Sequence, residues 1–438
     1  MNTAEPRSLL LVGFAREGQA SLRYFSKYSP TTDVYVCDEQ KILADLSGVK
    51  NHFEGPEYLE RAAKRDYDLI LRSPGIPPEK VQAFFPNTKV ITATGFFLEN
   101  APGTLIAVTG TKGKSTTTSL IAHIFAADRN DVRLVGNIGK PALDFLVDAD
   151  AETVFVCELS SFQLEDSTRS PQTAVLLPIV PEHLDHHGSF EKYCKAKATI
   201  FLFQKPSDFL VVDPRNVALS HRASHGTVVD VHKRCRWEGT TLLVDGESMG
   251  FSSHQLQLFG KGACDNVCYA VVTALLHNIS LNKILKALET FEPLPHRLEI
   301  VATKKNVTYI NDSLCTVPEA MINALESFPE RVSVLIAGGH DRGVPYEILG
   351  AALARANLTL LLLFHGAGER IAAVATLAGV SCPVLFVESM QQAVTLAQQY
   401  APSGTTVLLS PAASSFGIFK DYADRGDQFR KAVEQLEQ

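Results

Sequence analysis

A short segment rich in glycine and lysine has the residue types that bind a phosphate group. It reads Gly110-Thr111-Lys112-Gly113-Lys114-Ser115-Thr116 and lies between an apolar run and a helix-like stretch. Backbone N–H groups at such a turn bind phosphate oxygens, Lys114 would neutralise the β- and γ-phosphates, and Ser115 would reach Mg²⁺. The general pattern has a further glycine where Val108 stands. A turn that carries these residues by chance is the alternative, and the order strand, loop, helix argues against it.

One lysine falls within an apolar stripe. Ser189 is suited to cap a helix, and the residues that recur after it at helical spacing are Phe190, Tyr193, Lys197, Ile200 and Phe201. A buried ammonium is costly and its pKa falls, which favours the neutral amine. A neutral amine can react with CO₂ to give a carbamate, an anion that binds a hard cation. The alternative is a lysine whose ammonium extends along the stripe to solvent.

A carboxylate and several hydrogen-bonding side chains follow another apolar run. Glu158 ends that run, where it could supply an oxygen ligand for Mg²⁺. Side chains able to hydrogen-bond a substrate come next at Ser160, Ser161 and Gln163. An exposed glutamate with no function is the alternative for Glu158.

Three histidines, at positions 183, 186 and 187, raise the possibility of a zinc cluster. The sequence supplies no evident Cys or Glu partner of the kind that zinc sites usually contain. We therefore assign no role to His186 or His187.

The elements that must position these residues alternate between strands and helices. Early strands are predicted at 9–12, 34–37 and 68–71, with a helix at 18–27. A second series has strands at 105–108, 154–157 and 174–177, a β-rich stretch at 207–260, and helices at 266–277 and 281–290. A third series has strands at 307–310, 332–336, 359–364, 384–386 and 406–409.

This alternation predicts an α/β fold with parallel sheets. We expect three domains: a Rossmann-like N-terminal domain (1–99), a central α/β domain of the phosphate-loop type (100–297) and a Rossmann-like C-terminal domain (298–438).

Composition excludes several classes of protein. The 438 residues carry a net charge of −7 and form no basic stripe, which disfavours nucleic-acid binding. No apolar run approaches the roughly 18 residues of a membrane span, and the first apolar run is too short for a signal peptide. The eight cysteines include no CxxC pair and fit a reducing compartment. We expect a cytoplasmic protein.

The motifs together resemble those of the Mur ligase family, in order and along nearly the whole chain. GTKGKSTT resembles the phosphate loop of Mur ligases and folylpolyglutamate synthases, which lacks the first glycine. Residues 158–165 resemble the ELSSFQLE segment of glutamate-adding members, and His183-Leu184-Asp185 precedes Lys197 at the family's spacing. Further resemblances lie at residues 13–18, 73–77, 136–139, 296–297, 311–313, 410–416 and 419–426.

The resemblance implies site residues of five kinds. Catalytic roles fall on Lys114, Glu158, His183 and Lys197. Two Mg²⁺ ions are implied at Ser115, Glu158, His183 and a carbamylated Lys197. ATP would be bound by Gly110, Thr111, Lys112, Gly113, Lys114, Ser115, Thr116, Asn266, Arg297 and Asp312. The uridine-diphosphate substrate would be bound by Arg16, Glu17, Asp38, Gly75, Asn137, Ser160 and Gln163, and the amino acid by Thr316, Arg342, Ser415, Phe416 and Tyr422.

Some positions depart from the family pattern. Pro178 stands where asparagine is common, Gly262-Ala263 replaces His-Asn, and Leu314 replaces a lysine. Arg342 also stands where lysine is usual, although arginine still grips a carboxylate with two parallel bonds. These changes leave the identity and chirality of the added amino acid open.

The activity that the resemblance implies is an ATP-dependent, ADP-forming ligase of peptidoglycan precursor synthesis, which serves cell shape and division. It would add glutamate, D-glutamate being expected, to UDP-N-acetylmuramoyl-L-alanine through an acyl phosphate. A monomer is predicted, with closure of the third domain excluding water. The rivals are an L-glutamate-adding or other Mur-type ligase, and a nucleotide-binding homologue with a decayed site.

Overall fold

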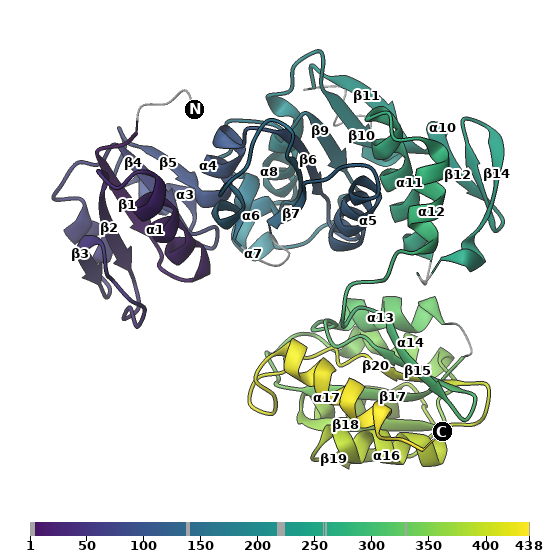
Figure 1. The fold of residues 1–438 in the computed structure, drawn as a ribbon. Helices are drawn as coiled ribbons and strands as arrows, with labels where there is room; N and C mark the ends of the chain where they lie inside the picture. Colours follow the sequence, from purple (N-terminus) through teal and green to yellow (C-terminus); the bar gives the residue numbers. More distant parts are fainter. Residues whose placement is uncertain are drawn as a thin grey trace. The chain divides into compact units, whose positions relative to one another are not determined.

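Parallel strands organise the larger sheets of the computed structural model (Figure 1). The structure describes residues 5–136, 141–216, 224–256, 258, 261–328 and 331–437. The chain divides into two compact units. The first unit is Met1–Gln255 with Asp265–Thr290, and the second is Leu256–Cys264 with Phe291–Gln438. The α/β fold class predicted from the sequence is confirmed, whereas the division into three domains stays a prediction.

The first sheet of the first unit has the strand order β3-β2-β1-β4-β5, and all its strand pairs are parallel. Its strands are β1 (Ser8–Val12), β2 (Asp33–Asp38), β3 (Val49–Glu54), β4 (Leu69–Arg72) and β5 (Lys89–Thr92). Its helices are α1 (Arg16–Tyr28), α2 (Tyr58–Ala62), α3 (Pro78–Gln82) and α4 (Ala93–Asn100). In β1, Leu9 and Leu11 enter one core cluster, whereas Leu10 and Val12 enter another. The sheet is therefore covered on both faces, which is why β1 is continuously apolar.

The second sheet of this unit has the order β11-β10-β9-β6-β8-β7 and is also parallel. Its strands are β6 (Thr104–Thr109), β7 (Val132–Gly136), β8 (Val154–Glu158), β9 (Thr173–Leu176), β10 (Phe209–Val212) and β11 (Thr227–Asp230). Its helices include α5 (Lys114–Ala126), α6 (Ser161–Leu164), α7 (Leu184–His187), α8 (Phe190–Leu202), α10 (Val231–Arg234), α11 (Lys261–Leu276) and α12 (Leu281–Glu289). A small antiparallel sheet of β12 (Cys235–Glu238), β13 (Thr241–Val244) and β14 (Glu247–Ser252) follows α10. Because β6 is central, the loop after it lies between two neighbouring strand ends.

The sheet of the second unit has the order β15-β16-β20-β17-β18-β19, in which only β15 is antiparallel to its neighbour. Its strands are β15 (Glu299–Lys304), β16 (Val307–Asn311), β17 (Val332–Gly339), β18 (Leu360–Gly366), β19 (Val384–Val387) and β20 (Thr406–Leu409). Its helices are α13 (Pro318–Ser327), α14 (Gly350–Arg355), α15 (Ala367–Leu377), α16 (Met390–Tyr400) and α17 (Tyr422–Glu434). Strands β16 and β17 end at the same edge as β20, which brings their loops together.

A buried arginine joins the two sheets of the first unit. The side chain of Arg72, at the end of β4, has no exposed surface, and its Nε donates to Asp166 Oδ2 at 2.6 Å. Its Nη1 donates to the carbonyl of Ile76 at 2.7 Å. The rings of Phe97 and Phe155 also meet between the sheets, with centroids 5.2 Å apart. The Arg72 side chain is buried and that of Asp166 is only 13% exposed, so removing either partner would leave a largely buried charge without its nearest ion-pair partner.

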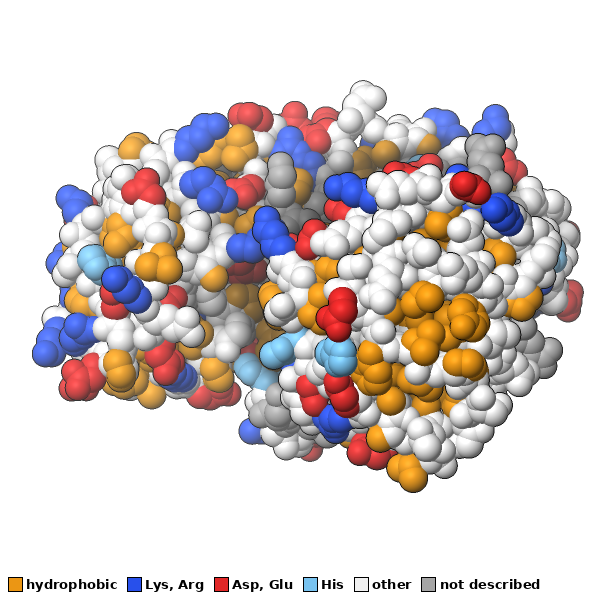
Figure 2. Space-filling view, turned by 90° about the horizontal axis from the view of Figure 1, so that it is seen from below, with side chains coloured by type: hydrophobic (Ala, Val, Ile, Leu, Met, Phe, Trp, Pro, Cys, Tyr) orange, Lys and Arg blue, Asp and Glu red, His pale blue; other side chains and the backbone are white. Residues whose placement is uncertain are grey.

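The surface is mixed in charge. On the face shown in Figure 2, lysine and arginine side chains are interspersed with aspartate and glutamate. Among the helices of the described residues, none has both the length and the apolar character that crossing a bilayer requires.

A half-buried histidine makes the stability of the first unit depend on pH. The His277 ring lies 2.9 Å (Nε2) from Thr173 Oγ1 and packs against Phe125. Burial, helped by the charge of Arg129, lowers the pKa of His277 from 6.5 to about 4. The folded state therefore keeps the ring neutral, whereas the unfolded chain binds a proton below pH 6.5. The free energy of unfolding must fall as pH decreases from 6.5 towards 4.

We predict that His277→Gln flattens this dependence. Between about pH 7 and pH 5, protonation of this histidine in the unfolded chain lowers the free energy of unfolding of wild type by about 2 kcal/mol. The variant lacks this contribution. Urea unfolding curves at both pH values measure the difference. The control His254→Gln, at an exposed position, is expected to follow wild type. Parallel pH dependences for wild type and His277→Gln would contradict the assignment.

Candidate active site

The loop between β6 and α5 has the geometry of a phosphate-binding turn. β6 ends at Thr109 and α5 begins at Lys114, so the predicted order of strand, loop and helix is present. Gly110 has φ +152°, and a Cβ there would lie 2.5 Å from the Leu177 Cβ. Gly113 caps α5 at φ +86°, and a Cβ there would lie 2.5 Å from Asn266 Oδ1. Both positions require glycine, which leaves backbone N–H groups at the start of α5 accessible to an anion.

Lys114 and Lys197 meet at one backbone oxygen. Lys114 Nζ donates to the carbonyl oxygen of Gly110 at 3.1 Å and to that of Thr111 at 2.9 Å. Lys197 Nζ, which reaches the loop from α8, donates to the same Gly110 oxygen at 2.7 Å. The two lysines predicted to act together therefore meet at the same loop.

Lys197 is buried as the sequence predicts, and Ser189 caps its helix by accepting from the N–H of Lys192. Only 2% of the Lys197 residue surface is exposed, and its Nζ lies 4.7 Å from the centroid of the Tyr193 ring. Burial, and then the nearby charge of Lys114, lowers the pKa of Lys197 to about 7. The predicted stripe is wrong at one position, since Phe190 is 39% exposed at the first turn of the helix.

Glu158 lies at the carboxyl end of β8, beside β6. It is 1% exposed and pairs in register with Val108. Its negative charge raises the pKa of Lys197, which places the carboxylate within electrostatic reach of that amine. Its carbonyl lies 2.2 Å from where a Cβ on Gly136 (φ +104°) would be, so this part of the edge also requires glycine.

The segment containing His183 is tied to the phosphate loop. Thr111 Oγ1 donates to the carbonyl of Val180 and accepts from its N–H, at 3.1 and 2.9 Å. The Thr111 N–H donates to the carbonyl of Pro178. This contact uses the backbone carbonyl of Pro178, which proline supplies as any other residue does. The His183 side chain is half exposed, at φ +55°, with its ring 5.2 Å from that of Phe162.

Not all of the other residues predicted to bind ATP contact the loop between β6 and α5. Asn266, on α11, accepts from Thr117 Oγ1 at 3.1 Å and lies against Gly113, so it belongs to the loop. Ser115 and Thr116 lie in the first turn of α5. Lys112 instead forms an exposed ion pair with Glu182 at 2.6 Å.

The predicted residues for the uridine-diphosphate substrate gather where β1 and β2 end. Asp38 Oδ2 accepts from the N–H of Phe14 at 2.8 Å. Gln163, on α6, donates to Glu17 at 3.4 Å and to Thr94 at 3.0 Å, and its Oε1 accepts from the N–H of Ser160. Arg16 begins α1 and Gly75 follows β4. Asn137 lies outside the described residues.

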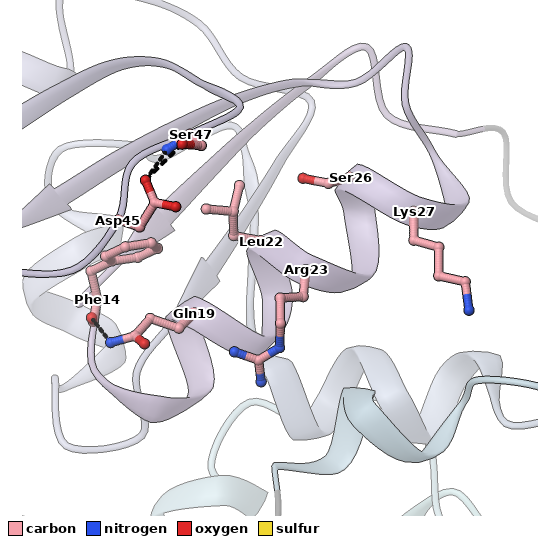
Figure 3. Close-up of a pocket in the computed structure, with 8 residues that line it drawn as sticks. All are labelled: Phe14, Gln19, Leu22, Arg23, Ser26, Lys27, Asp45 and Ser47. Atoms are coloured by element: carbon pink, nitrogen blue, oxygen red, sulfur yellow. Dashed lines mark hydrogen bonds between the residues drawn. The ribbon is translucent and has the colours of Figure 1, made fainter.

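A cavity of about 500 Å³ lies along α1 (Figure 3). Its lining residues are Phe14, Gln19, Leu22, Arg23, Ser26, Lys27, Asp45 and Ser47. Figure 3 shows the amide of Gln19 directed at the carbonyl of Phe14, a contact of 3.4 Å. None of the predicted substrate residues lines this cavity.

In the second unit, Asp312 lies at the end of β16. Its two oxygens accept from Ser410 Oγ at 2.9 Å and from the N–H of Leu298 at 3.3 Å. Burial raises the pKa of Asp312 to about 7, against the lowering effects of Ser410 and Arg297. Arg297 therefore lies within electrostatic reach of Asp312, as expected for two residues predicted to bind one nucleotide.

The residues predicted to bind the amino acid come from three loops of this unit, which follow β16, β17 and β20, and from the start of α17. Arg342 Nη2 donates to the carbonyl of Thr316 at 2.8 Å. Ser415 is buried, whereas Phe416 and Tyr422 are 61% and 44% exposed.

Arg425, which the sequence analysis did not single out, connects these loops. It is completely buried and donates to Ser313 Oγ at 2.9 Å and to the carbonyl of Ala413 at 3.0 Å. Ser313 Oγ in turn donates to the carbonyl of Tyr422 at 2.7 Å. The only signal in the sequence was an arginine placed directly before Gly426, within a segment that resembles the family.

His186 and His187, to which we assigned no role, both contact Glu165. The nitrogen atoms His186 Nε2 and His187 Nδ1 lie 3.0 and 3.1 Å from Glu165 Oε1. The expectation that no carboxylate partner exists was wrong, because the sheet brings together α6 and α7, which are about 20 residues apart in the sequence.

The fold and the loop define an α/β enzyme class that binds a nucleotide on its central sheet. Residues 108–274 match the model of the Mur ligase middle domain, and residues 296–413 match that of the "Mur ligase, glutamate ligase domain". The UDP-N-acetylmuramoylalanine–D-glutamate ligase of Koribacter versatilis is 37% identical over 392 residues, which cover 85% of this chain and 84% of that protein. The enzyme of the same name from Clostridioides difficile is 31% identical over 457 residues, covering 98% and 99%.

Solved structures agree on the fold. The UDP-N-acetylmuramate–alanine ligase MurC of Thermotoga maritima superposes with a TM-score of 0.60 at 19% identity, covering 98% of this chain and 100% of that chain. The MurF ligase of the same organism, in complex with ADP, gives 0.58 at 17% identity, covering 98% and 95%. This chain belongs to the Mur ligase family. It is an ATP-dependent, ADP-forming amino-acid ligase, as the sequence predicts.

We predict that Gly113→Ala abolishes nucleotide binding while the protein still folds. The new Cβ meets Asn266 Oδ1 at 2.5 Å, in addition to the strain of φ +86°. Gly55→Ala is the matched control, because Gly55 also has φ +86° but has no atom within 4 Å of the added Cβ. Both variants lose about 1 to 2 kcal/mol to backbone strain.

Thermal melting with and without ADP separates the two effects. ADP is expected to raise the Tm of wild type and of Gly55→Ala, but not that of Gly113→Ala. An equal shift in all three proteins would show that the contact between Gly113 and Asn266 has no part in nucleotide binding.

Proposed function

We propose that this ligase joins D-glutamate to the alanine carboxylate of UDP-N-acetylmuramoyl-L-alanine, in the cytoplasmic synthesis of peptidoglycan precursors. The observation that carries the proposal is the convergence of Lys114 and Lys197 on the Gly110 carbonyl, within electrostatic reach of Glu158. This arrangement suits phosphoryl transfer to a carboxylate. The choice of substrates is supported by relatives with this activity in their names, at 31–37% identity.

The residues present fit a magnesium-bound triphosphate. The start of α5 offers backbone N–H groups, and Lys114 supplies a positive charge at the loop. Ser115 and Glu158 supply the oxygen ligands that Mg²⁺ prefers, and His183 would take part in a second site. Asn266 would contact the nucleotide from α11, and Arg297 and Asp312 are further residues proposed to bind it. Bound Mg²⁺ supplies charge neutralisation for the transferred phosphoryl group.

Lys197 fits carbamylation because two cations would otherwise share one oxygen. A pKa near 7 leaves a large fraction of the amine neutral at physiological pH. Reaction of that neutral amine with CO₂ forms an N–C bond and releases one proton. The product is an anion beside Lys114, so repulsion between two cations becomes attraction between opposite charges. The same anion would supply a further oxygen ligand to Mg²⁺.

The chain's own groups then position the reactants. In the first step the alanine carboxylate attacks the γ-phosphorus of ATP, giving an acyl phosphate and ADP. In the second, the amine of glutamate attacks the acyl carbon, phosphate leaves, and the nitrogen loses a proton to form the amide. Such transfer depends on positioning and charge neutralisation more than on covalent help from the protein. Lys114 stabilises charge on the γ-phosphate, and Arg342 would hold a glutamate carboxylate.

The substrate residues would act from both units. In the first unit, Glu17 and Gln163, which contact each other, would bind the uridine-diphosphate sugar together with Arg16, Asp38 and Gly75, which lie near the ends of strands. In the second unit, Thr316, Arg342, Ser415, Phe416 and Tyr422 would bind the incoming amino acid. We propose that the enzyme acts as a monomer.

We predict that Lys197→Ala lowers kcat by at least about a hundredfold, because a metal ligand and a charge partner of Lys114 are lost. Lys195→Ala is the matched control, since Lys195 lies on the same helix but is exposed. Wild type and Lys195→Ala are expected to lose activity in buffer depleted of CO₂ and to regain it with bicarbonate. The residual activity of Lys197→Ala is expected to stay the same when bicarbonate is added. Full wild-type activity without CO₂ would rule out the carbamate.

The choice of amino acid is tested by phosphate release with UDP-N-acetylmuramoyl-L-alanine, ATP, Mg²⁺ and each glutamate enantiomer. D-glutamate is expected to support turnover at least tenfold better than L-glutamate. A preference for L-glutamate would overturn the proposed enantiomer. Release only with a different amino acid, or with none, would refute the proposed reaction.

A further inference from the structure

Glu165, His186 and His187 present three metal-ligand atoms to one point. Glu165 caps the C-terminus of α6, and the two histidines end α7. Glu165 Oε1, His186 Nε2 and His187 Nδ1 all lie within 4.8 Å of one another. The two contacts of Oε1, at 3.0 and 3.1 Å, approach the spacing of about 3.3 Å between neighbouring ligands of a tetrahedral zinc ion.

The surroundings hold these ligands in place. The second ring nitrogen of His187, Nε2, lies 3.0 Å from Ser161 Oγ, and a bond donated there places the ring hydrogen on Nε2, so that Nδ1 carries the lone pair that a metal ligand needs. The other carboxylate oxygen, Glu165 Oε2, lies 3.5 Å from the buried guanidinium of Arg72. Phe162 contacts both imidazole rings, with ring centroids 4.4 and 5.4 Å away. Metal sites in proteins have this kind of second layer, with a partner for each ligand.

His365, a histidine elsewhere in the chain, contacts two carboxylates in an arrangement that forms ion pairs but does not suit a metal ion. His365 contacts Glu369 through Nδ1 at 2.7 Å and Glu388 through Nε2 at 3.4 Å. The two carboxylates lie at different ring nitrogens, so the potential ligands do not converge, and all three side chains are more than half exposed. The side chains of Glu165, His186 and His187 are only 13%, 15% and 2% exposed.

We propose that Glu165, His186 and His187 bind a divalent transition-metal ion of the zinc class, with water as the fourth ligand. Two imidazoles and one carboxylate favour zinc over magnesium, which prefers oxygen ligands. The site is separate from the magnesium sites of the proposed reaction, since none of its ligands belongs to them. A bound ion would fasten α7 to α6, the helix that carries Gln163 into contact with Glu17.

The test uses full-length protein stripped with a chelator and then titrated with Co²⁺ in excess Mg²⁺ and ADP, which occupy the reaction site. We expect one equivalent of Co²⁺ to give the visible absorption of a four-coordinate ion and to be displaced by one equivalent of Zn²⁺. His186→Gln and Glu165→Gln are expected to weaken binding by at least about tenfold. The controls His365→Gln and His183→Gln are expected to keep wild-type affinity.

Two outcomes overturn the proposal. One is that wild-type protein takes up no Co²⁺ or Zn²⁺ in excess Mg²⁺. The other is that His183→Gln loses the signal while His186→Gln keeps it, which would assign the ion to the reaction site. His186 is the most exposed ligand, so its variant is expected to fold, and circular dichroism checks this. Zn²⁺ is also expected to raise the Tm of wild type and not that of His186→Gln.

Discussion

The buried amine of Lys197 is the constraint on which the central site depends. A cation with 2% exposure needs a strong acceptor, and the Gly110 carbonyl at 2.7 Å is that acceptor. The carbonyl is available because Gly110 has a backbone conformation that side-chain-bearing residues rarely adopt. Lys114 uses the same oxygen, so the phosphate loop, α5 and α8 are held in one arrangement. Burial, and then repulsion between the two amines, lowers the pKa of Lys197 and makes its neutral form accessible.

A second buried cation extends this arrangement to the first sheet. Arg72 donates to Asp166, directly after α6, while Gln163 within α6 contacts Glu17 on α1. A helix of only four residues therefore connects the end of β8, where Glu158 lies, with the residues proposed to bind the nucleotide sugar. Buried ion pairs contribute little net stability, but they penalise every other arrangement in which the charge is left unpaired. The precision needed for reaction between two bound substrates is consistent with such a connection.

The sequence predicted the strongly periodic elements well, because burial on both faces imposes long apolar runs. Strands such as Leu9–Val12 and Val154–Cys157 were of this kind. It missed β3, β7 and β15, in which at most one residue is buried, and also β5, a buried strand of only four residues. Within the site, loop residues with a spacing motif were found, whereas Arg425 and the contact of Glu165 with His186 were not. These contacts depend on which strands are neighbours in the sheet, and the pattern of residues along the chain does not specify the order of the strands.

The departures from the family pattern lie at two kinds of position. Pro178 lies beside the loop after β6, where its carbonyl accepts from the N–H of Thr111, a contact that needs no particular side chain. Arg342, in the second unit, donates through Nη2 to the Thr316 carbonyl, and its guanidinium has further N–H donors for the ligand proposed there. In the proposed reaction a change such as Leu314 would therefore affect which amine is accepted rather than whether a carboxylate is phosphorylated. Specificity would depend on a few side chains on loops, whereas the chemistry would also depend on the glycine conformations of the loop after β6.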